Sequence, residues 1–157
     1  MMTAGLAGCG SGETDVERPE QPSASSSTPE TSDSETDRMD IQIRIDEQTF
    51  EATLTDSAAA RDLLAQLPAS IEMSDHGGVE KTGPLASSLS LDGQPEGADP
   101  DVGDVGYYAP GNDLVLYYGD QSYYPGIVIL GRMSGDAAAR IAELDGSITA
   151  VIKSTSS

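Results

Sequence analysis

Tryptophan is absent from this chain of 157 residues, and phenylalanine, histidine and cysteine occur once each. One cysteine excludes an internal disulfide, and one cysteine with one histidine excludes a Cys/His zinc cluster. No apolar run approaches the about 20 residues of a membrane-spanning helix. Only 8 lysines and arginines oppose 27 aspartates and glutamates, so the formal net charge is −19. We therefore expect no nucleic-acid partner and no basic patch for anionic lipid.

The single cysteine, Cys9, ends the tetrapeptide Leu-Ala-Gly-Cys. This segment resembles the lipobox of bacterial lipoproteins, in which the cysteine is lipidated after signal cleavage. Residues 1–9 are shorter than a normal signal peptide and contain no lysine or arginine, so they resemble a truncated one. The resemblance implies a lipid-anchored, extracytoplasmic protein of the bacterial cell envelope. The alternative is a chance match, which would leave a cytoplasmic protein.

Residues 10–38 are rich in serine, threonine, proline and acidic residues, and Val16 is their only large apolar residue. Such a segment cannot bury enough apolar surface to offset the loss of chain entropy on folding. We expect a disordered acidic linker, extended by self-repulsion. Behind a lipidated Cys9, this linker would hold the following domain, expected at 39–154, away from a membrane.

From Met39 onward, apolar and polar residues alternate in short runs, as they do in half-buried strands. The expected strands cover 39–45, 50–54, 105–109, 114–118, 126–133 and 148–152, with a further strand starting at 71–73 and a weakly alternating run at 85–91. The expected helices cover 58–67, where Pro68 follows, and 137–144. Seven or eight strands with two helices favour a closed or nearly closed barrel whose open ends the helices cover.

The stretch 102–120 holds four of the six tyrosines, in two adjacent pairs. A turn-forming run, Pro110-Gly111-Asn112-Asp113, separates the pairs and predicts a hairpin. Neighbours on a strand face opposite ways, so one tyrosine of each pair is expected to enter a core or a pocket. The hairpin is therefore the most favourable place for a site. The pairs are Tyr107 with Tyr108 and Tyr117 with Tyr118.

Four segments together resemble a bacterial family of cyclophilin-like domains. They are residues 40–68, HGGVEKTGPL at 76–85, VGDVGYYAPGNDLVLYYGD at 102–120 and PGIVILGRM at 125–133. The resemblance implies a mainly β fold, a closed eight-stranded barrel of cyclophilin type with two α-helices. It implies no particular activity, because this family is largely uncharacterised and a fold does not carry a function.

Cyclophilins proper are peptidyl-prolyl isomerases, which polarise the prolyl amide with an arginine and hold the proline between aromatic residues. This sequence has no arginine in a comparable motif, and Arg44 and Arg132 are the candidate donors. A weak prolyl isomerase is therefore the alternative to a non-catalytic binding module. A structural envelope protein without a ligand is a third reading.

Two further candidates flank the Gly-Gly turn at 77–78. His76 is a possible general base, although a turn histidine is more often simply exposed. Glu80 and Lys81 are adjacent and lie in a segment that carries the family resemblance. They either frame a pocket or form a solvated ion pair on the surface.

The acidic loop at 92–104 offers oxygen atoms of the kind that bind calcium, but not at the spacing of a calcium-binding loop. No glycine-rich phosphate loop and no nucleophile motif is present. We therefore assign no metal, no cofactor and no catalytic residue, and the oligomeric state stays open. The expected ligand is a small molecule or an extended peptide. The cleft expected to bind it is bounded by Glu80, Lys81, Tyr108, Tyr118 and Arg132.

Overall fold

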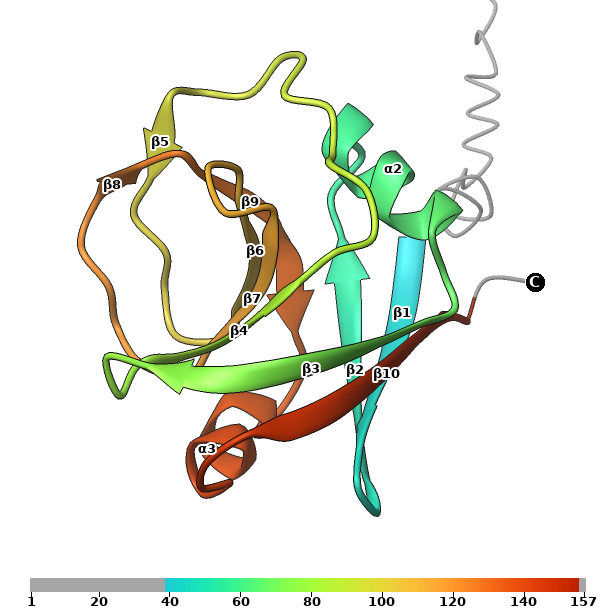
Figure 1. Cartoon of the computed structure of the whole chain (residues 1–157), viewed down its shortest axis with the longest axis vertical. Coiled ribbons are helices and arrows are strands. Elements are labelled where there is room, and N and C mark those ends of the chain that lie inside the picture. The colour runs from blue at the N-terminus through green and yellow to red at the C-terminus, as the bar shows by residue number, and fades with distance from the viewer. Residues whose placement is uncertain (1–38, 156–157) are drawn as a thin grey trace, which may run out of the picture.

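The computed structural model describes residues 39–155, which form a closed barrel of eight antiparallel strands (Figure 1). In chain order the elements are β1 (Met39–Ile45), β2 (Gln48–Leu54), α2 (Ala58–Ala65), β3 (Ala69–His76), β4 (Glu80–Pro84), β5 (Gly97–Ala98), β6 (Asp104–Tyr108), β7 (Asp113–Tyr117), β8 (Tyr124–Pro125), β9 (Ile127–Met133), α3 (Ala137–Ala142) and β10 (Ile148–Ser154). Around the barrel the strands follow the order β1-β10-β3-β4-β7-β6-β9-β2. The predicted fold class is confirmed. Cys9 and the expected linker at 10–38 lie outside the described residues.

The barrel interior is filled by the alternating apolar residues of its strands. Ile41 and Ile43 of β1 are fully buried, and the register places them opposite Ala52 and Phe50 of β2. A tight turn at Asp46, with φ of 54°, joins the two strands. Because all these side chains face one core, a one-residue slip would expose the whole set, which fixes the register.

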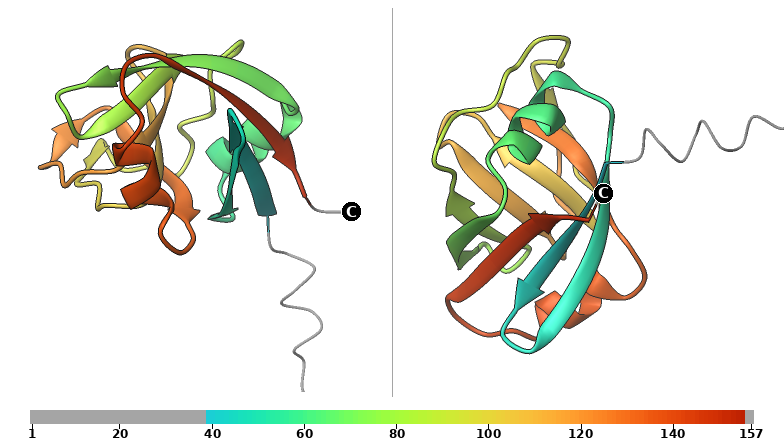
Figure 2. Two further views of the ribbon diagram at one scale, coloured as in Figure 1. Left: turned by 90° about the horizontal axis from the view of Figure 1, so that it is seen from below. Right: turned by 90° about the vertical axis from the view of Figure 1, so that its right-hand side faces the viewer.

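The two helices lie at opposite ends of the barrel (Figures 1 and 2). Ser57 caps α2 by accepting a hydrogen bond from the Ala60 amide at 3.1 Å, and Leu63 of α2 is fully buried. Ile141 of α3 is also fully buried in the same core. Both helices cover the ends as expected, and each stops two residues before its predicted end.

Residues 85–91, where the sequence alternates weakly, form no strand. The loop is instead held by side chains from elsewhere in the chain. The Asn112 side-chain amide donates to the Leu85 carbonyl at 3.0 Å, and the Leu89 amide donates to the Tyr107 hydroxyl at 3.2 Å. These partners take the place of a neighbouring strand, so the expectation of strand structure here was wrong.

A second apolar layer lies on the outer face of the barrel wall. Leu114 and Leu116 of β7 point into the main core, whereas Val115 and Tyr117 form a separate buried cluster with Ile127. The short β5–β8 pair lies beside β9 on this side (Figure 1). The outer face of β7 and β9 is therefore partly covered by other segments of the chain, and a cavity lies on this face.

Candidate functional site

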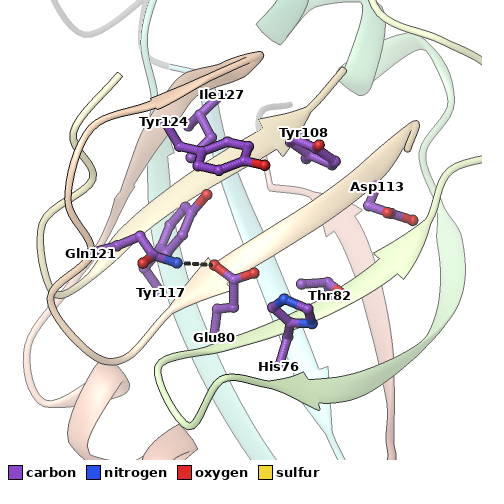
Figure 3. A pocket seen from close by; sticks show the side chains of 9 residues that line it. All are labelled: His76, Glu80, Thr82, Tyr108, Asp113, Tyr117, Gln121, Tyr124 and Ile127. Carbon is purple, nitrogen blue, oxygen red and sulfur yellow. Dashed lines mark hydrogen bonds between the residues drawn. The ribbon is translucent and has the colours of Figure 1, made fainter. Parts of the chain in front are cut away.

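A cavity of about 500 Å³ opens on the outer face of the barrel (Figure 3). Its walls come from β3, β4, β7, β6, β9 and the segment that contains β8. The lining residues are His76, Glu80, Thr82, Tyr108, Asp113, Tyr117, Gln121, Tyr124 and Ile127. The cavity volume is within the range of about 300–1,000 Å³ that is usual for small-molecule sites.

Three tyrosines form the aromatic part of the cavity. Tyr117 is only 1% exposed, whereas Tyr124 is 54% exposed and stands at the rim. The rings of Tyr108 and Tyr124 are tilted by 56° with their centroids 6.0 Å apart. Burial raises the pKa of the Tyr117 phenol, and burial together with the neighbouring Tyr124 raises the pKa of Tyr108. The phenols of Tyr108 and Tyr117 therefore stay neutral, and all three tyrosines offer aromatic faces with polar tips.

Gly106 of β6 makes room for Tyr117. A Cβ atom at this position would stand 2.7 Å from Cε2 of the tyrosine ring, which is closer than any real contact. The absence of a side chain thus lets the ring lie across β6 and form the cavity wall.

Glu80 is the most deeply placed carboxylate of the cavity, at 8% exposure. Its Oε2 accepts a hydrogen bond from the Gln121 side-chain amide at 3.2 Å (Figure 3). Burial raises the pKa of Glu80, and Gln121 and His76 only partly offset this effect. Among the described residues, no lysine or arginine forms an ion pair with it. The cavity therefore contains a largely buried carboxylate that no described lysine or arginine neutralises.

Asp113 supplies a second carboxylate on the same side. It pairs in register with Pro84, two positions beyond Thr82 and four beyond Glu80, so strand alternation brings these side chains to one face. Burial raises the pKa of Asp113 as well. With no lysine or arginine among the lining residues, the cavity is negative at neutral pH.

Lys81 faces the barrel interior, on the side of the strand opposite to Glu80. It is fully buried, and its Nζ donates to the carbonyls of Leu144 at 2.6 Å and Gly146 at 3.0 Å and pairs with Asp75 at 3.2 Å. These bonds fasten the segment after α3 to β4. The Lys81 ammonium group is thus bound by groups of the protein itself and does not reach the cavity.

Tyr118 belongs to the same cluster, which reaches from buried Lys81 to the partly exposed Asp75. Its hydroxyl donates a short hydrogen bond to Asp75, and its ring lies 6.0 Å from Lys81 Nζ. Burial and the bond to Asp75 raise the pKa of Tyr118 to about 12. The same bond, reinforced by Lys81, holds the pKa of Asp75 below its ordinary value.

Arg132 borders a different and more open hollow of about 460 Å³ beside Thr53 and Ile129. Its guanidinium group pairs with Asp104 at 3.0 Å and donates to the Val102 carbonyl at 3.1 Å. These contacts anchor the start of β6 to β9.

The structure brings together two of the five predicted site residues, Glu80 and Tyr108. It places Lys81, Tyr118 and Arg132 elsewhere, so the five do not bound a single cleft. His76, weighed as a base, does line the cavity. The residues that the sequence interpretation missed are Thr82, Asp113, Tyr117, Gln121, Tyr124 and Ile127.

The alternation of side chains along each strand could have shown which of the predicted residues face the cavity and which face the barrel interior. Glu80 and Lys81 are neighbours on one strand and must face opposite sides. The hairpin register pairs Tyr108 with Asp113, which puts Tyr108 on the face of Tyr117 and not of Tyr118. Gln121 and Tyr124 had no such signal, because they reach the cavity from a loop and a two-residue strand.

Within residues 39–155, no three histidine, cysteine or acidic side chains gather in a way that would hold a metal ion. In the same range, no helix is both long and apolar enough to cross a membrane.

The fold and the cavity define a closed β-barrel domain with a walled pocket on its outer face. This chain belongs to the cyclophilin-like family, whose model matches residues 43–153. No curated protein matches it.

Two solved structures share the fold. One is the hypothetical protein AF2241 from Archaeoglobus fulgidus, with 18% identity and a TM-score of 0.60 over 74% of this chain and 94% of that one. The other is McbB in complex with tryptophan, with 17% identity and a TM-score of 0.53 over 74% of this chain and 45% of McbB. At these identities, the likeness concerns the fold alone.

Proposed function

We propose that the barrel is a binding domain, which takes a small molecule or a short peptide segment into the outer-face cavity. The observation that carries this proposal is the nearly buried Glu80 carboxylate facing a cavity of about 500 Å³ walled by three tyrosines. A cavity with aromatic walls and a few convergent polar groups is typical of ligand sites. Keeping an unpaired carboxylate in such a place costs stability, and proteins tolerate that cost mostly where function needs it.

Binding is favoured over catalysis by what surrounds the cavity. No arginine among the described residues lines it, whereas Arg132 is held by Asp104 and Arg44 lies exposed and donates to the Asp46 carbonyl. An isomerase needs a fixed cationic donor beside the prolyl amide. Prolyl isomerisation is therefore the alternative, and a protease-coupled assay with a prolyl peptide tests it. Catalysis that Arg132→Ala or Arg44→Ala abolishes would overturn the binding-domain proposal.

A site-blocking substitution tests the binding proposal. Thr82 is half-buried on the cavity wall, so Thr82→Phe would fill the space without removing a charge. Thr149→Phe makes the same change on an exposed position of β10. In a thermal-shift screen of metabolites and short peptides, we expect ligands that stabilise the wild type and Thr149→Phe but not Thr82→Phe. A screen in which nothing stabilises the wild type would favour a structural protein instead.

We also propose that the domain is held at a bacterial cell envelope through a lipid on Cys9, with residues 10–38 as the tether. The lipobox-like sequence and the polar composition of the tether support this proposal. The protein should then be recovered in the membrane fraction of its native cells, and Cys9→Ser should release it. Recovery of the native protein in the soluble cytoplasmic fraction would contradict this localisation.

A further inference from the structure

We propose that the ligand of the outer-face cavity carries a positive charge, as an ammonium, a guanidinium or a quaternary ammonium group, which Glu80 and Asp113 bind between the three tyrosines. This inference rests on the proposed binding function and specifies the chemical class of the ligand. The cation has two possible sources, a free small amine and a basic side chain of a peptide, and they share this chemistry.

The charged residues around the cavity favour a cationic ligand. Its lining includes two carboxylates, Glu80 and Asp113, but neither a lysine nor an arginine. The one buried lysine or arginine among the described residues, Lys81, faces the opposite side of β4 and is bound by Asp75 and two carbonyls. An anionic ligand would meet only like charge at neutral pH. A neutral ligand would displace water from the Glu80 carboxylate without supplying an opposite charge. Removing water from an ionised group in this way costs free energy.

The Glu80 carboxylate can accept more hydrogen bonds than the protein supplies. The residue is more than nine-tenths buried, and Gln121 donates only to its Oε2. The other carboxylate oxygen, Oε1, accepts no hydrogen bond from a side chain or backbone amide of the described residues. The carboxylate to which it belongs faces the cavity (Figure 3). An ionised carboxylate accepts several hydrogen bonds, so Glu80 is ready to receive a charged donor from outside the protein.

The aromatic wall of the cavity also suits a cation. Cations bind favourably over tyrosine rings, and cages of aromatic residues with carboxylates recognise alkylated ammonium groups. Tyr117 supplies the deep wall, and Tyr108 and Tyr124 supply two tilted rings near the mouth. The hydroxyls of Tyr117 and Tyr108 stay protonated at neutral pH, so these two rings add no competing charge of their own.

The net charge of the chain adds a long-range electrostatic effect. The formal charge of −19 gives the molecule a negative potential that concentrates cations near its surface. This effect alone is unspecific, and salt screens it. A specific cation site must therefore show selectivity that the other acidic residues of the chain do not reproduce.

The experiment compares cations with neutral molecules of the same shape. The full-length ¹⁵N-labelled chain is titrated with choline and with 3,3-dimethyl-1-butanol, its uncharged isostere. A second pair is N-acetyl-lysine methylamide and N-acetyl-norleucine methylamide, and acetate is the anionic probe. The side-chain NH₂ signal of Gln121 reports on the cavity, because this group donates to Glu80.

We expect both cations to shift the Gln121 signal with an affinity about tenfold or more above that of their neutral isosteres. Glu80→Gln should remove this preference. Glu51→Gln is the matched control, because Glu51 also accepts a hydrogen bond from a glutamine amide, Gln42, at 3.0 Å, but on an exposed strand. If choline binds more tightly than the lysine derivative, the free amine is the favoured source. The reverse order favours a peptide side chain, and either order supports the cation class.

Two negative results have different meanings. Equal binding of cations and isosteres in the cavity, unchanged in Glu80→Gln, would refute the cation class and leave the binding function standing. Acetate binding more tightly than choline would do the same. No shift of cavity signals by any probe, with Thr82→Phe also without effect in the metabolite screen, would refute both.

Discussion

Glu80 on β4 lies directly opposite Tyr117 on β7, and both side chains face the outer cavity. The pair joins a carboxylate with a raised pKa to a phenol whose pKa is raised by burial and by the charge of Glu80. The charge of Glu80 makes it harder for Tyr117 to ionise, whereas the pKa of Glu80 itself is raised by burial. The fold thus maintains a polar pair that no described lysine or arginine neutralises.

Replacing Glu80 with glutamine should stabilise the protein at neutral pH. The change removes a desolvated charge and keeps an oxygen that accepts from Gln121. We expect a gain of about 0.5–1 kcal/mol in the free energy of unfolding. The exposed counterpart, Glu51→Gln, should be nearly neutral. Thermal unfolding of the three proteins at pH 7 measures the difference, and a clear loss of stability in Glu80→Gln would show that the carboxylate is a structural residue.

This gain should depend on pH in a defined direction. The folded protein holds the Glu80 proton more tightly than the unfolded chain, which releases it near 4.5. The wild type is therefore stabilised below pH 4.5 and loses that contribution as the pH rises through the higher folded-state pKa. The advantage of Glu80→Gln should be present at pH 7 and vanish near pH 4. An advantage independent of pH would contradict the assignment.

Affinity for a cationic probe should fall as the pH falls. Glu80 and Asp113 both have raised pKa values, so each loses its charge at a higher pH than an ordinary carboxyl group. Choline titrations between pH 7.5 and 4.5 measure this loss, which we expect to reach about tenfold. The other ionisable groups facing the cavity are His76 from β3, Tyr117 from β7, Tyr108 from β6 and Tyr124 from β8. His76→Gln controls for protonation of the imidazole, and affinity independent of pH in this variant would contradict carboxylate recognition.

Gly106→Ala should disturb the cavity from beneath. The new methyl group would meet the Tyr117 ring at 2.7 Å and force it to move. We expect a loss of about 1–3 kcal/mol in unfolding free energy together with loss of probe binding. In a Tyr117→Ala background the same substitution should cost less, because the clashing ring is gone. Equal costs in both backgrounds would mean that the glycine is needed for another reason.

The Lys81 cluster should affect stability but not ligand binding. Lys81→Met leaves the Leu144 and Gly146 carbonyls without their donor, and we expect a loss of about 2 kcal/mol. Asp75→Asn should cost less, since Asp75 is partly exposed. Its folded-state pKa is lowered, so its contribution is present above the ordinary value of 3.8 and disappears as the pH falls through the lower folded value.

Probe titration of these two variants, below their unfolding temperatures, separates the cluster from the cavity. We expect choline affinities within about twofold of the wild type, a difference of about 0.4 kcal/mol. A large loss of affinity in Lys81→Met would return this residue to the binding site.

The fold was predictable because its signal is local. Ile41 and Ile43 alternate with polar residues, and alternation directly specifies a half-buried strand. The loop at 85–91 was not predictable, since Asn112 and Tyr107 hold it from positions 27 and 18 residues away along the chain. No periodicity within the loop itself records these partners.

The candidate site was predictable only in part. Glu80 and Tyr108 were identified from the resembling segments, but the face that each strand residue takes depends on the register. The sequence predicted Tyr118 as a cavity residue beside Tyr108. Because Tyr108 pairs with Asp113, Tyr108 shares its face with Tyr117, and Tyr117 forms the cavity wall instead. Lys81 was included in the site because it adjoins Glu80 after the Gly-Gly turn and lies in a segment that carries the family resemblance. Only the carbonyls of Leu144 and Gly146 explain why a lysine, which is rarely buried, lies inside the barrel.

The central claim is that the outer cavity binds a cation through Glu80, and a crystal structure of the full chain soaked with N-acetyl-lysine methylamide tests it most directly. We predict the probe's ammonium group at hydrogen-bond distance from Glu80 Oε1, with its alkyl chain against the ring of Tyr117. The same soak of Glu80→Gln should leave the cavity without the probe. A probe seated beside Arg132, or equally occupied in the cavity of both proteins, would contradict the account.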